Sequence, residues 1–439
     1  SLRYSGNNMM FESKGSGCFA GEKVNLYCLQ AFLNSIVGMY YIHALAPTLD
    51  YSEGALLKLP YDIRTHKNIS EVALDNITIC KDDWNAFEVS WDFRHHPLLR
   101  KVPTIAEAFD QWQTECIDRF NQLKANEEEL NRIFIDIYGL QDELTPVVED
   151  KDVTVRKADL GRDIRSFISY AIGCMFGRYS IYKTGLIYAG GDWNAAYGNF
   201  PIDKIELDDS ILHGSGFHTY GAPITDKSVV YLKDPTEMKD AEEFWGVDAD
   251  NIIPICSDEY FTDDIVERFV KFVRIVYGAD TLDENLKFIA DALGGKGQPK
   301  DVIRNYFLSD FYSDHCKIYQ KRPIYWLFDS GKKNGFKALI YMHRYQPDTI
   351  ARIRTKYVFE QQDRYHTAIA DLERRIANAS TGERVKLNKK LTTLQAQDTE
   401  IGTYEEKIHH LADQMISIDL DDGVKKNYAI FKDVLAKIK

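Results

Sequence analysis

Basic and aromatic side chains are concentrated in residues 304–357, and together they suit the binding of phosphates and bases. Six lysines and five arginines outweigh four aspartates there, so this stretch carries a formal charge of +7 in a chain whose total is −13. Twelve aromatic residues are interleaved with these charges. Cationic groups attract a phosphate backbone, and aromatic faces stack on bases. Because the whole chain is acidic, any contact with nucleic acid must be local.

Two apolar runs within this stretch predict the β-hairpin that would position the basic groups. The runs KRPIYWLF and FKALIYMHRY flank DSGKKNG, a turn rich in Gly, Asn, Asp and Ser, which is typical of paired antiparallel strands. Nucleic-acid contact is expected for Lys332, Lys333 and Lys337. The alternative is a buried aromatic core with a solvated turn, and we expect four apolar residues to lie in a core: Trp326, Leu327, Leu339 and Ile340.

Known motifs of catalysis and metal binding are missing from the sequence. It contains no Walker A segment, no HExxH and no G-x-S-x-G. It also has no Pro-Pro pair, which the base-gripping loop of amino-methyltransferases requires. The carboxylate pairs 208–209 and 263–264 could be read as metal ligands, but the second pair sits at a predicted helix start, where negative charge offsets the helix dipole. The sequence therefore predicts no catalytic residue and no metal site.

Composition and cysteine usage indicate an intracellular protein with well-filled cores. The 439 residues are enough for two to four domains, and 44% of them are hydrophobic. Residues 201–300 carry a formal charge of −11, directly before the basic stretch. The seven cysteines are scattered and form no C-x-x-C pair, which is typical of reduced thiols. The longest apolar run, near residues 167–176, is too short to span a bilayer, so we expect a cytoplasmic protein without membrane contact.

Helical periodicity dominates the chain and predicts a mostly helical α+β fold with several lobes. Asn34 and Ser35, inside the first helix, could cap a break, contact a partner or bond to local backbone. Capping boxes are expected at Thr104 with Glu107 and at Thr281 with Glu284. Residues 65–100 are read as a connector, and residues 348–411 as a long antiparallel helical hairpin interrupted at 378–382. The other predicted helices span residues 26–45, 104–139, 167–180, 263–277, 282–293 and 301–320, and a last amphipathic helix is expected in the C-terminal tail.

Longer motifs resemble a known family. AFLNSIVGMYYIHALAPTLDYSEGALLKLP is similar to the closing helix and turn of the target-recognition region of large adenine-specific DNA methyltransferases. Four other segments resemble the C-terminal half of the PglX-like methyltransferases of BREX phage-defence systems, and the resemblance runs nearly end to end. They are VTVRKADLGRDIRSFISYAIGCMFGRYS, DDWNAFEVSWDF, HCKIYQKRPIYWLFDSGKKNGFKALIYMHRY and IDLDDGVKKNY.

The resemblance implies an N6-adenine methyltransferase that uses S-adenosylmethionine and whose catalytic domain lies upstream of this chain. The chain itself would then hold no catalytic residue and no cofactor, and would be inactive alone. Five segments follow: the end of the target-recognition region (1–64), a connector and long helix (65–150), an acidic α+β domain (151–300), the basic aromatic hairpin region (301–357), and a helical hairpin with a C-terminal helix (358–439).

Double-stranded DNA is the partner that this interpretation implies. From charge alone, we expect contacts from the basic β-hairpin and its neighbours, from a glycine-rich loop near residue 14, and from the segment RKADLGRDIRS. The full set of expected DNA-binding residues is Lys14, Arg162, Arg165, Lys321, Arg322, Lys332, Lys333, Lys337, Arg344, Arg352 and Arg354.

Two other functions remain open from the sequence. The acidic middle and the helical hairpin could form a protein-interaction module that docks other defence subunits or is captured by a phage DNA-mimic inhibitor. A free-standing enzyme such as a nuclease is the third possibility, and metal-dependent cleavage by the chain alone would be its sign.

Overall fold

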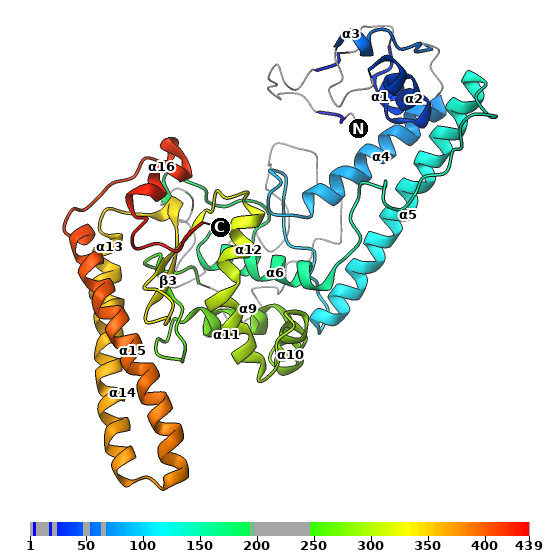
Figure 1. Cartoon of the computed structure of the whole chain (residues 1–439). Helices are drawn as coiled ribbons and strands as arrows, with labels where there is room; N and C mark the ends of the chain where they lie inside the picture. Colours follow the sequence, from blue (N-terminus) through cyan, green and yellow to red (C-terminus); the bar gives the residue numbers. More distant parts are fainter. Residues whose placement is uncertain are drawn as a thin grey trace, which may run out of the picture. The chain divides into compact units, whose positions relative to one another are not determined.

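The chain is α+β and mostly helical, as predicted, in the computed structural model shown in Figure 1. The structure describes residues 3–5, 17–19, 24–46, 53–62, 67–193, 196 and 246–438. The chain divides into two compact units: unit 1 is residues 1–90 and 110–158, and unit 2 is residues 91–109 and 159–439. The division into five segments remains a prediction.

Unit 1 begins with two short helices where the sequence predicts one. α1 (Leu26–Asn34) and α2 (Ile36–Leu45) are separated at Ser35. The Ser35 hydroxyl accepts a hydrogen bond from the Gly38 N–H at 3.1 Å, which satisfies a free donor at the start of α2. The same hydroxyl donates to the Phe32 carbonyl at 2.7 Å, so of the roles left open for Ser35 the structure shows both the cap and the local backbone bond. The short helix α3 (Glu53–Leu56) follows.

Two longer helices complete unit 1. α4 (Lys67–Asn85) is a helix that the sequence did not predict within residues 65–100, whose reading as a connector stays a prediction. Its residues Ile69, Ala73 and Ile77 recur every four positions and are buried, but the polar residues between them hide the helical period. α5 (Ile105–Tyr138) matches the predicted long helix and contributes its residues from 110 onward to this unit. It ends at Gly139, whose φ of +67° favours glycine.

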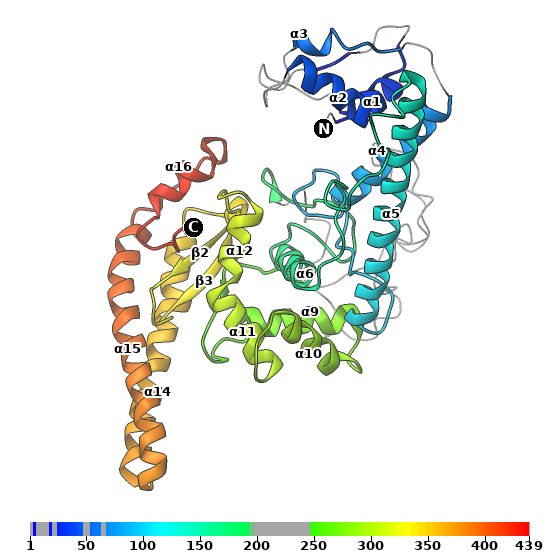
Figure 2. The same cartoon turned by 45° about the vertical axis from the view of Figure 1, so that its right-hand side comes forward.

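A group of helices in unit 2 packs around an aromatic core. α6 (Leu160–Met175) contacts α9 (Ile265–Tyr277), α10 (Leu282–Ala292) and α12 (Phe311–Ile318). α11 (Pro299–Ser309) and α12 replace a single predicted helix and are divided at Asp310. The expected capping box at Thr281 is wrong, because its hydroxyl donates to the Pro103 carbonyl at 2.7 Å and makes no cap. Figure 2 shows α9 to α12 beside α6.

The predicted β-hairpin is confirmed and forms most of a small antiparallel sheet. β2 (Tyr325–Asp329) pairs with β3 (Lys337–Tyr341), with Leu327 opposite Leu339. β1 (Ile253–Pro254) lies on the other side of β3. The N–H of Ala436 donates to the Leu327 carbonyl at 2.8 Å, so the end of the chain lies along β2. The four residues predicted as core, Trp326, Leu327, Leu339 and Ile340, are all buried.

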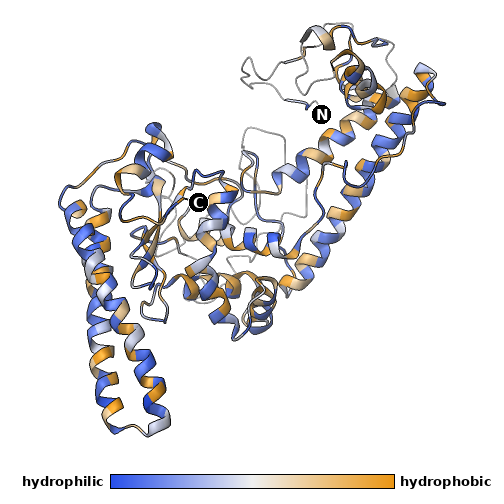
Figure 3. Cartoon of the chain, viewed as in Figure 1, coloured by the Kyte–Doolittle hydropathy of each residue, from blue (hydrophilic) through white to orange (hydrophobic). Residues whose placement is uncertain are grey.

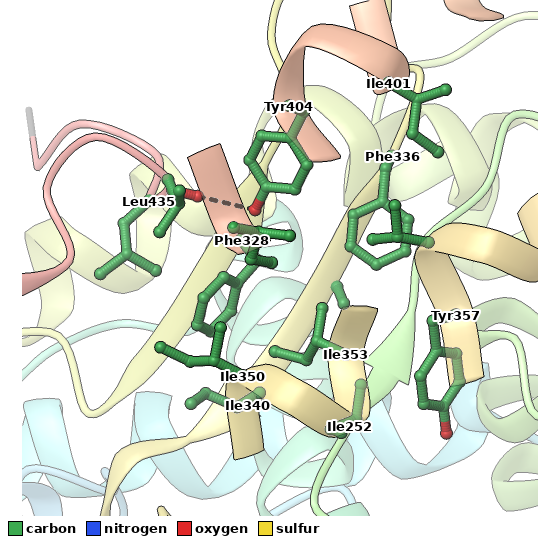
Figure 4. Packing of buried hydrophobic residues seen from close by; sticks show 14 of the residues in the cluster. Ile252, Phe328, Phe336, Ile340, Ile350, Ile353, Tyr357, Ile401, Tyr404 and Leu435 are labelled. Carbon is green, nitrogen blue, oxygen red and sulfur yellow. Dashed lines mark hydrogen bonds between the residues drawn. The ribbon is translucent and has the colours of Figure 1, made fainter. Parts of the chain in front are cut away.

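The predicted helical hairpin is also confirmed and covers one face of this sheet. A short 3-10 helix, η3 (Met342–Arg344), leads to α13 (Thr349–Arg352) and to η4 (Ile353–Val358), a π-helical turn. The hairpin itself consists of α14 (Phe359–Asn378) and α15 (Thr381–Ala412), on which hydrophobic and hydrophilic positions alternate (Figure 3). Phe328 and Ile340 of the strands pack with Ile353 and Tyr404 in a shared core (Figure 4). The chain closes with η5 (Leu420–Asp422) and α16 (Gly423–Ile430).

Candidate nucleic-acid interface

The turn between β2 and β3, residues 330–336, is held in one conformation by a carboxylate from α15. Glu400 accepts hydrogen bonds from the Ser330 hydroxyl at 2.8 Å, from the Lys333 N–H at 2.8 Å and from the Gly335 N–H at 3.0 Å. Hydrogen bonds to a charged acceptor are stronger than those between neutral groups. The turn is therefore a fixed platform, and the N–H groups of Lys333 and Gly335 are already used by the protein.

Two further side chains of the helical hairpin bind the same turn. Gln397 donates to the Lys333 carbonyl at 3.0 Å, and the Tyr365 hydroxyl donates to the Gly335 carbonyl at 2.8 Å. Burial raises the pKa of Tyr365, so its hydroxyl keeps the proton that it donates. A Cβ at residue 335 would lie 2.6 Å from the Gln397 carbonyl oxygen, so this close approach requires glycine.

Lys332 and Lys333, on this platform, are exposed, whereas Lys337 is not. Lys337 is only 7% exposed. Its Nζ donates to the Leu308 carbonyl at 2.8 Å and lies 3.8 Å from the Asp329 carboxylate. The expectation that Lys337 contacts DNA is corrected by this burial, because reaching a phosphate would break both interactions.

Lys321 and Arg322 are exposed as well, but they precede β2 and so lie at the opposite end of the strand from the turn. The five residues of β2 lie between the two pairs and span roughly 17 Å at about 3.3 Å per residue. His315 positions this end, because its Nε2 accepts hydrogen bonds from the N–H groups of Ile324 and Tyr325 at 3.1 and 3.2 Å. The two exposed pairs are therefore not adjacent.

Three expected DNA-binding arginines bind the protein itself. Arg344 donates to the Phe176 carbonyl at 3.3 Å, and its guanidinium carbon lies 3.9 Å from the centre of the Trp193 ring. Arg352 donates to the Asp250 carbonyl at 2.8 Å and pairs with Asp348 at 3.0 Å. Arg354 pairs with Glu405 at 2.6 Å. These contacts join η3, α13 and η4 to neighbouring segments, so part of the local positive charge is neutralised within the fold.

The remaining expected residues divide between α6 and an undescribed segment. Arg162 pairs with the buried carboxylate of Asp163 at 2.7 Å, and Arg165 lies 3.5 Å from Asp314 of α12. Lys14 lies outside the described residues. Of the ten expected residues that the structure describes, four are exposed: Lys321, Arg322, Lys332 and Lys333.

Carboxylate pairs that could suggest a metal site have other roles or are not described. The Asp264 carboxylate accepts from the Val266 N–H at 3.0 Å and caps α9, as predicted for this pair. Asp208 and Asp209 lie outside the described residues. Within the described ranges, no three His, Cys, Asp or Glu side chains are placed to hold a metal ion. No helix in these ranges combines the length and apolarity needed to cross a membrane.

Sequence reasoning missed the residues that position the candidate interface. Glu400, Gln397 and His315 act on backbone groups of the β-hairpin and its ends. Glu400 and Gln397 are more than 60 residues away from the turn along the chain. In the sequence, Glu400 and Gln397 are polar residues next to the apolar stripe of a predicted helix. Such residues are common in solvated helices, so this pattern does not identify them as contacts of the turn.

Comparison with known proteins identifies relatives along the whole chain. No family model matches it. It is 43% identical over 441 residues to the adenine-specific methyltransferase PglX of Lacticaseibacillus casei strain Zhang, covering 98% of the chain and 33% of that protein. It is 33% identical over 463 residues to the adenine-specific methyltransferase BrxX of Escherichia coli O9:H4 strain HS, covering 100% of the chain and 35% of that protein. The chain is therefore a PglX-like sequence, homologous along its length to about a third of an adenine-specific methyltransferase.

Proposed function

We propose that this chain is the DNA-recognition and scaffold part of an N6-adenine DNA methyltransferase in a BREX phage-defence system. Identity of 43% across 98% of the chain to a protein named as an adenine-specific methyltransferase is the observation that carries this proposal. Methyl transfer from S-adenosylmethionine would belong to a catalytic region outside the chain. Work on host DNA would place the protein in the cytoplasm.

The structure supports a specific way for the chain to meet a duplex. Lys332 and Lys333 project from a turn whose backbone is fixed by Glu400 and Gln397. A rigid turn loses little conformational freedom when its lysines bind phosphates, so more of the electrostatic attraction remains as affinity. Phosphate contacts of this kind fix the orientation of a protein on DNA and do not read the sequence.

The arginines that bind within the protein support the proposed role as a scaffold. Arg344, Arg352 and Arg354 connect segments of unit 2 through carbonyl and carboxylate contacts. Exposed Lys321 and Arg322 remain candidates for a second phosphate contact at the other end of β2.

Charge reversal at the turn tests this function. Lys332→Glu with Lys333→Glu should weaken binding of a duplex of about 20 base pairs by at least ~10-fold, measured by fluorescence anisotropy at low salt, because two attractive contacts become repulsive. Lys296→Glu with Lys425→Glu makes the same charge change at exposed residues of other segments and should leave affinity near that of the unmodified chain. Equal affinities for the two variants would remove the turn from the interface.

A protein-interaction module remains the second candidate, and one observation favours it. The Trp91 side chain in unit 2 is 100% exposed, and exposed tryptophans are frequent anchors of protein interfaces. Retention of other defence subunits or of an acidic phage inhibitor, without duplex binding even at low salt, would favour this function. Trp91→Ala should then release the captured protein.

A further inference from the structure

The helical hairpin carries a second group of basic residues, at the end farthest from the β-sheet. The first ten residues of α15, 381–390, contain one glutamate and four basic residues, whereas the remaining residues to 412 contain four acidic residues and one lysine. Helix dipoles favour the opposite arrangement, with acids near the start and bases near the end. Helix stability alone therefore does not account for this distribution of charge.

The three lysines of this group are exposed and have no acidic partner among the described residues: Lys386, Lys389 and Lys390. Their spacing of three and four residues brings like charges together on one helix, which costs roughly 0.2–0.5 kcal/mol per pair. Nearer the sheet, by contrast, two arginines are neutralised: Arg354 of η4 by Glu405, and Arg364 by Glu360. Lys407 is exposed there without an ion pair, so in the part of the hairpin that the structure describes the unneutralised charge is concentrated toward the tip.

Helical geometry places two of these lysines, Lys386 and Lys389, on the face of α15 that holds the β2–β3 turn, and Lys390 lies beside that face. Lys389 precedes Glu400 by 11 residues and Lys386 precedes it by 14, which are about three and about four turns at about 3.6 residues per turn. Both side chains therefore leave α15 in nearly the direction in which Glu400 meets the turn. From residue 386 to residue 397 the sequence contains no Asp or Glu.

The helical hairpin continues past the end of the sheet in both views (Figures 1 and 2). At about 1.5 Å per residue, Lys389 and Lys386 lie roughly 16 and 21 Å along α15 from Glu400. Phosphates of one DNA strand recur at about 3.4 Å along the helix axis, so a length of roughly 21 Å corresponds to about six base-pair steps. A single duplex of this length can therefore reach from the turn lysines to the tip lysines.

We propose that Lys386, Lys389 and Lys390 continue the surface of Lys332 and Lys333 into one strip that binds the phosphate backbone of duplex DNA along α15. This inference rests on the proposed function and adds to it the tip of the helical hairpin as a second phosphate-contacting site. The five lysines of the strip bind phosphates and read no bases, so their contribution is the same for every DNA sequence.

Neutral variants at the tip test the strip. Lys386→Gln/Lys389→Gln/Lys390→Gln should weaken duplex binding by about ten-fold or more at low salt and lower the slope of log affinity against log salt by about 0.9 for each phosphate that is no longer bound. Arg384→Gln removes a positive charge from the same end of α15, but residue 384 precedes Glu400 by 16 residues and therefore points to the opposite face. That control should bind as the unmodified chain does.

Thermal unfolding shows whether the triple variant has lost its fold rather than its DNA contacts. Because the substitutions remove like-charge repulsion, its melting temperature should be unchanged or higher. A triple variant with unaltered affinity and salt slope, while the Lys332 and Lys333 variants lose binding, would overturn the strip and leave the proposed function standing. An unmodified chain that binds no duplex at low salt would overturn both.

Discussion

At the residue scale, the side chains that define the candidate interface act on the backbone from a distance. Glu400 binds three donors of the β2–β3 turn, and His315 binds two at the start of β2. The sequence predicts the exposed lysines of the turn correctly as turn residues, since their neighbours are turn formers. It gives no indication of Glu400, because its partners become neighbours only after α15 packs on the sheet.

Removing the Glu400 carboxylate should destabilise unit 2. Glu400→Ala leaves the N–H groups of Lys333 and Gly335 without their acceptor, so the free energy of unfolding should fall by about 1–3 kcal/mol in urea denaturation. Glu400→Gln keeps an amide oxygen as an acceptor and should lose less. Glu406→Ala, at an exposed residue of the same helix, serves as the control. A Glu400→Ala variant no less stable than that control would refute the fixed turn.

Two buried histidines predict a specific sensitivity to acid. Burial, followed by the nearby charge of Arg178, lowers the pKa of His315 to about 3, and burial, followed by His95 and Arg100, lowers that of His96 to about 3. Each folded-state pKa lies below the unfolded value of about 6.5. Their contribution to stability is therefore present above pH ~6.5 and is lost as pH falls toward the folded-state pKa values.

Urea unfolding between neutral pH and about pH 5 measures this loss. The free energy of unfolding should decrease on the order of 1 kcal/mol per pH unit for each histidine once pH is below about 6.5. His315→Gln removes one titrating group and should show a shallower dependence. The same slope in both proteins would mean that His315 is not held neutral in the fold.

At the scale of elements, the spacing of apolar residues predicts a helix where one face is clearly apolar, and does not where polar residues interrupt that face. α5, α9 and α10 and the β-hairpin agree with the sequence, because each has a clear apolar stripe or a clear turn. α4 was missed because polar or less buried residues separate its four buried apolar positions, Ile69, Ala73, Ile77 and Ile79. The breaks at Ser35 and Asp310 depend on local caps and on packing, which periodicity does not report.

A glycine of the β2–β3 turn, Gly335, and a glycine at the start of α15, Gly382, should respond to alanine in opposite ways. Gly335→Ala would place a Cβ 2.6 Å from the Gln397 carbonyl oxygen, and because backbone must move, stability should fall by about 1–3 kcal/mol. Gly382, near the start of α15, has open space around it, so Gly382→Ala should stabilise the helix by up to about 1 kcal/mol. Melting temperatures of the two variants provide the check. A Gly335→Ala protein as stable as Gly382→Ala would contradict the close packing of the turn on α15.

At the scale of the whole molecule, a chain of charge −13 still carries exposed cations among the residues that the structure describes. In the described part of unit 2, the arginines expected to bind DNA mostly support the fold, whereas lysines at the turn and at the hairpin tip remain available. Local composition identifies the turn lysines as candidates for DNA binding but not the lysines at the hairpin tip. Composition also does not separate cations that bind within the protein from cations that are exposed, because the partners of a side chain are set by the tertiary structure.

The salt dependence of duplex binding by the unmodified chain tests the central claim most directly. If the chain recognises DNA through a local strip of lysines, the logarithm of affinity should fall linearly with the logarithm of salt concentration, with a slope of about 0.9 for each phosphate contacted and so roughly 2 to 5 in total. Absence of binding at the lowest salt, or an affinity that does not change with salt, would contradict the account.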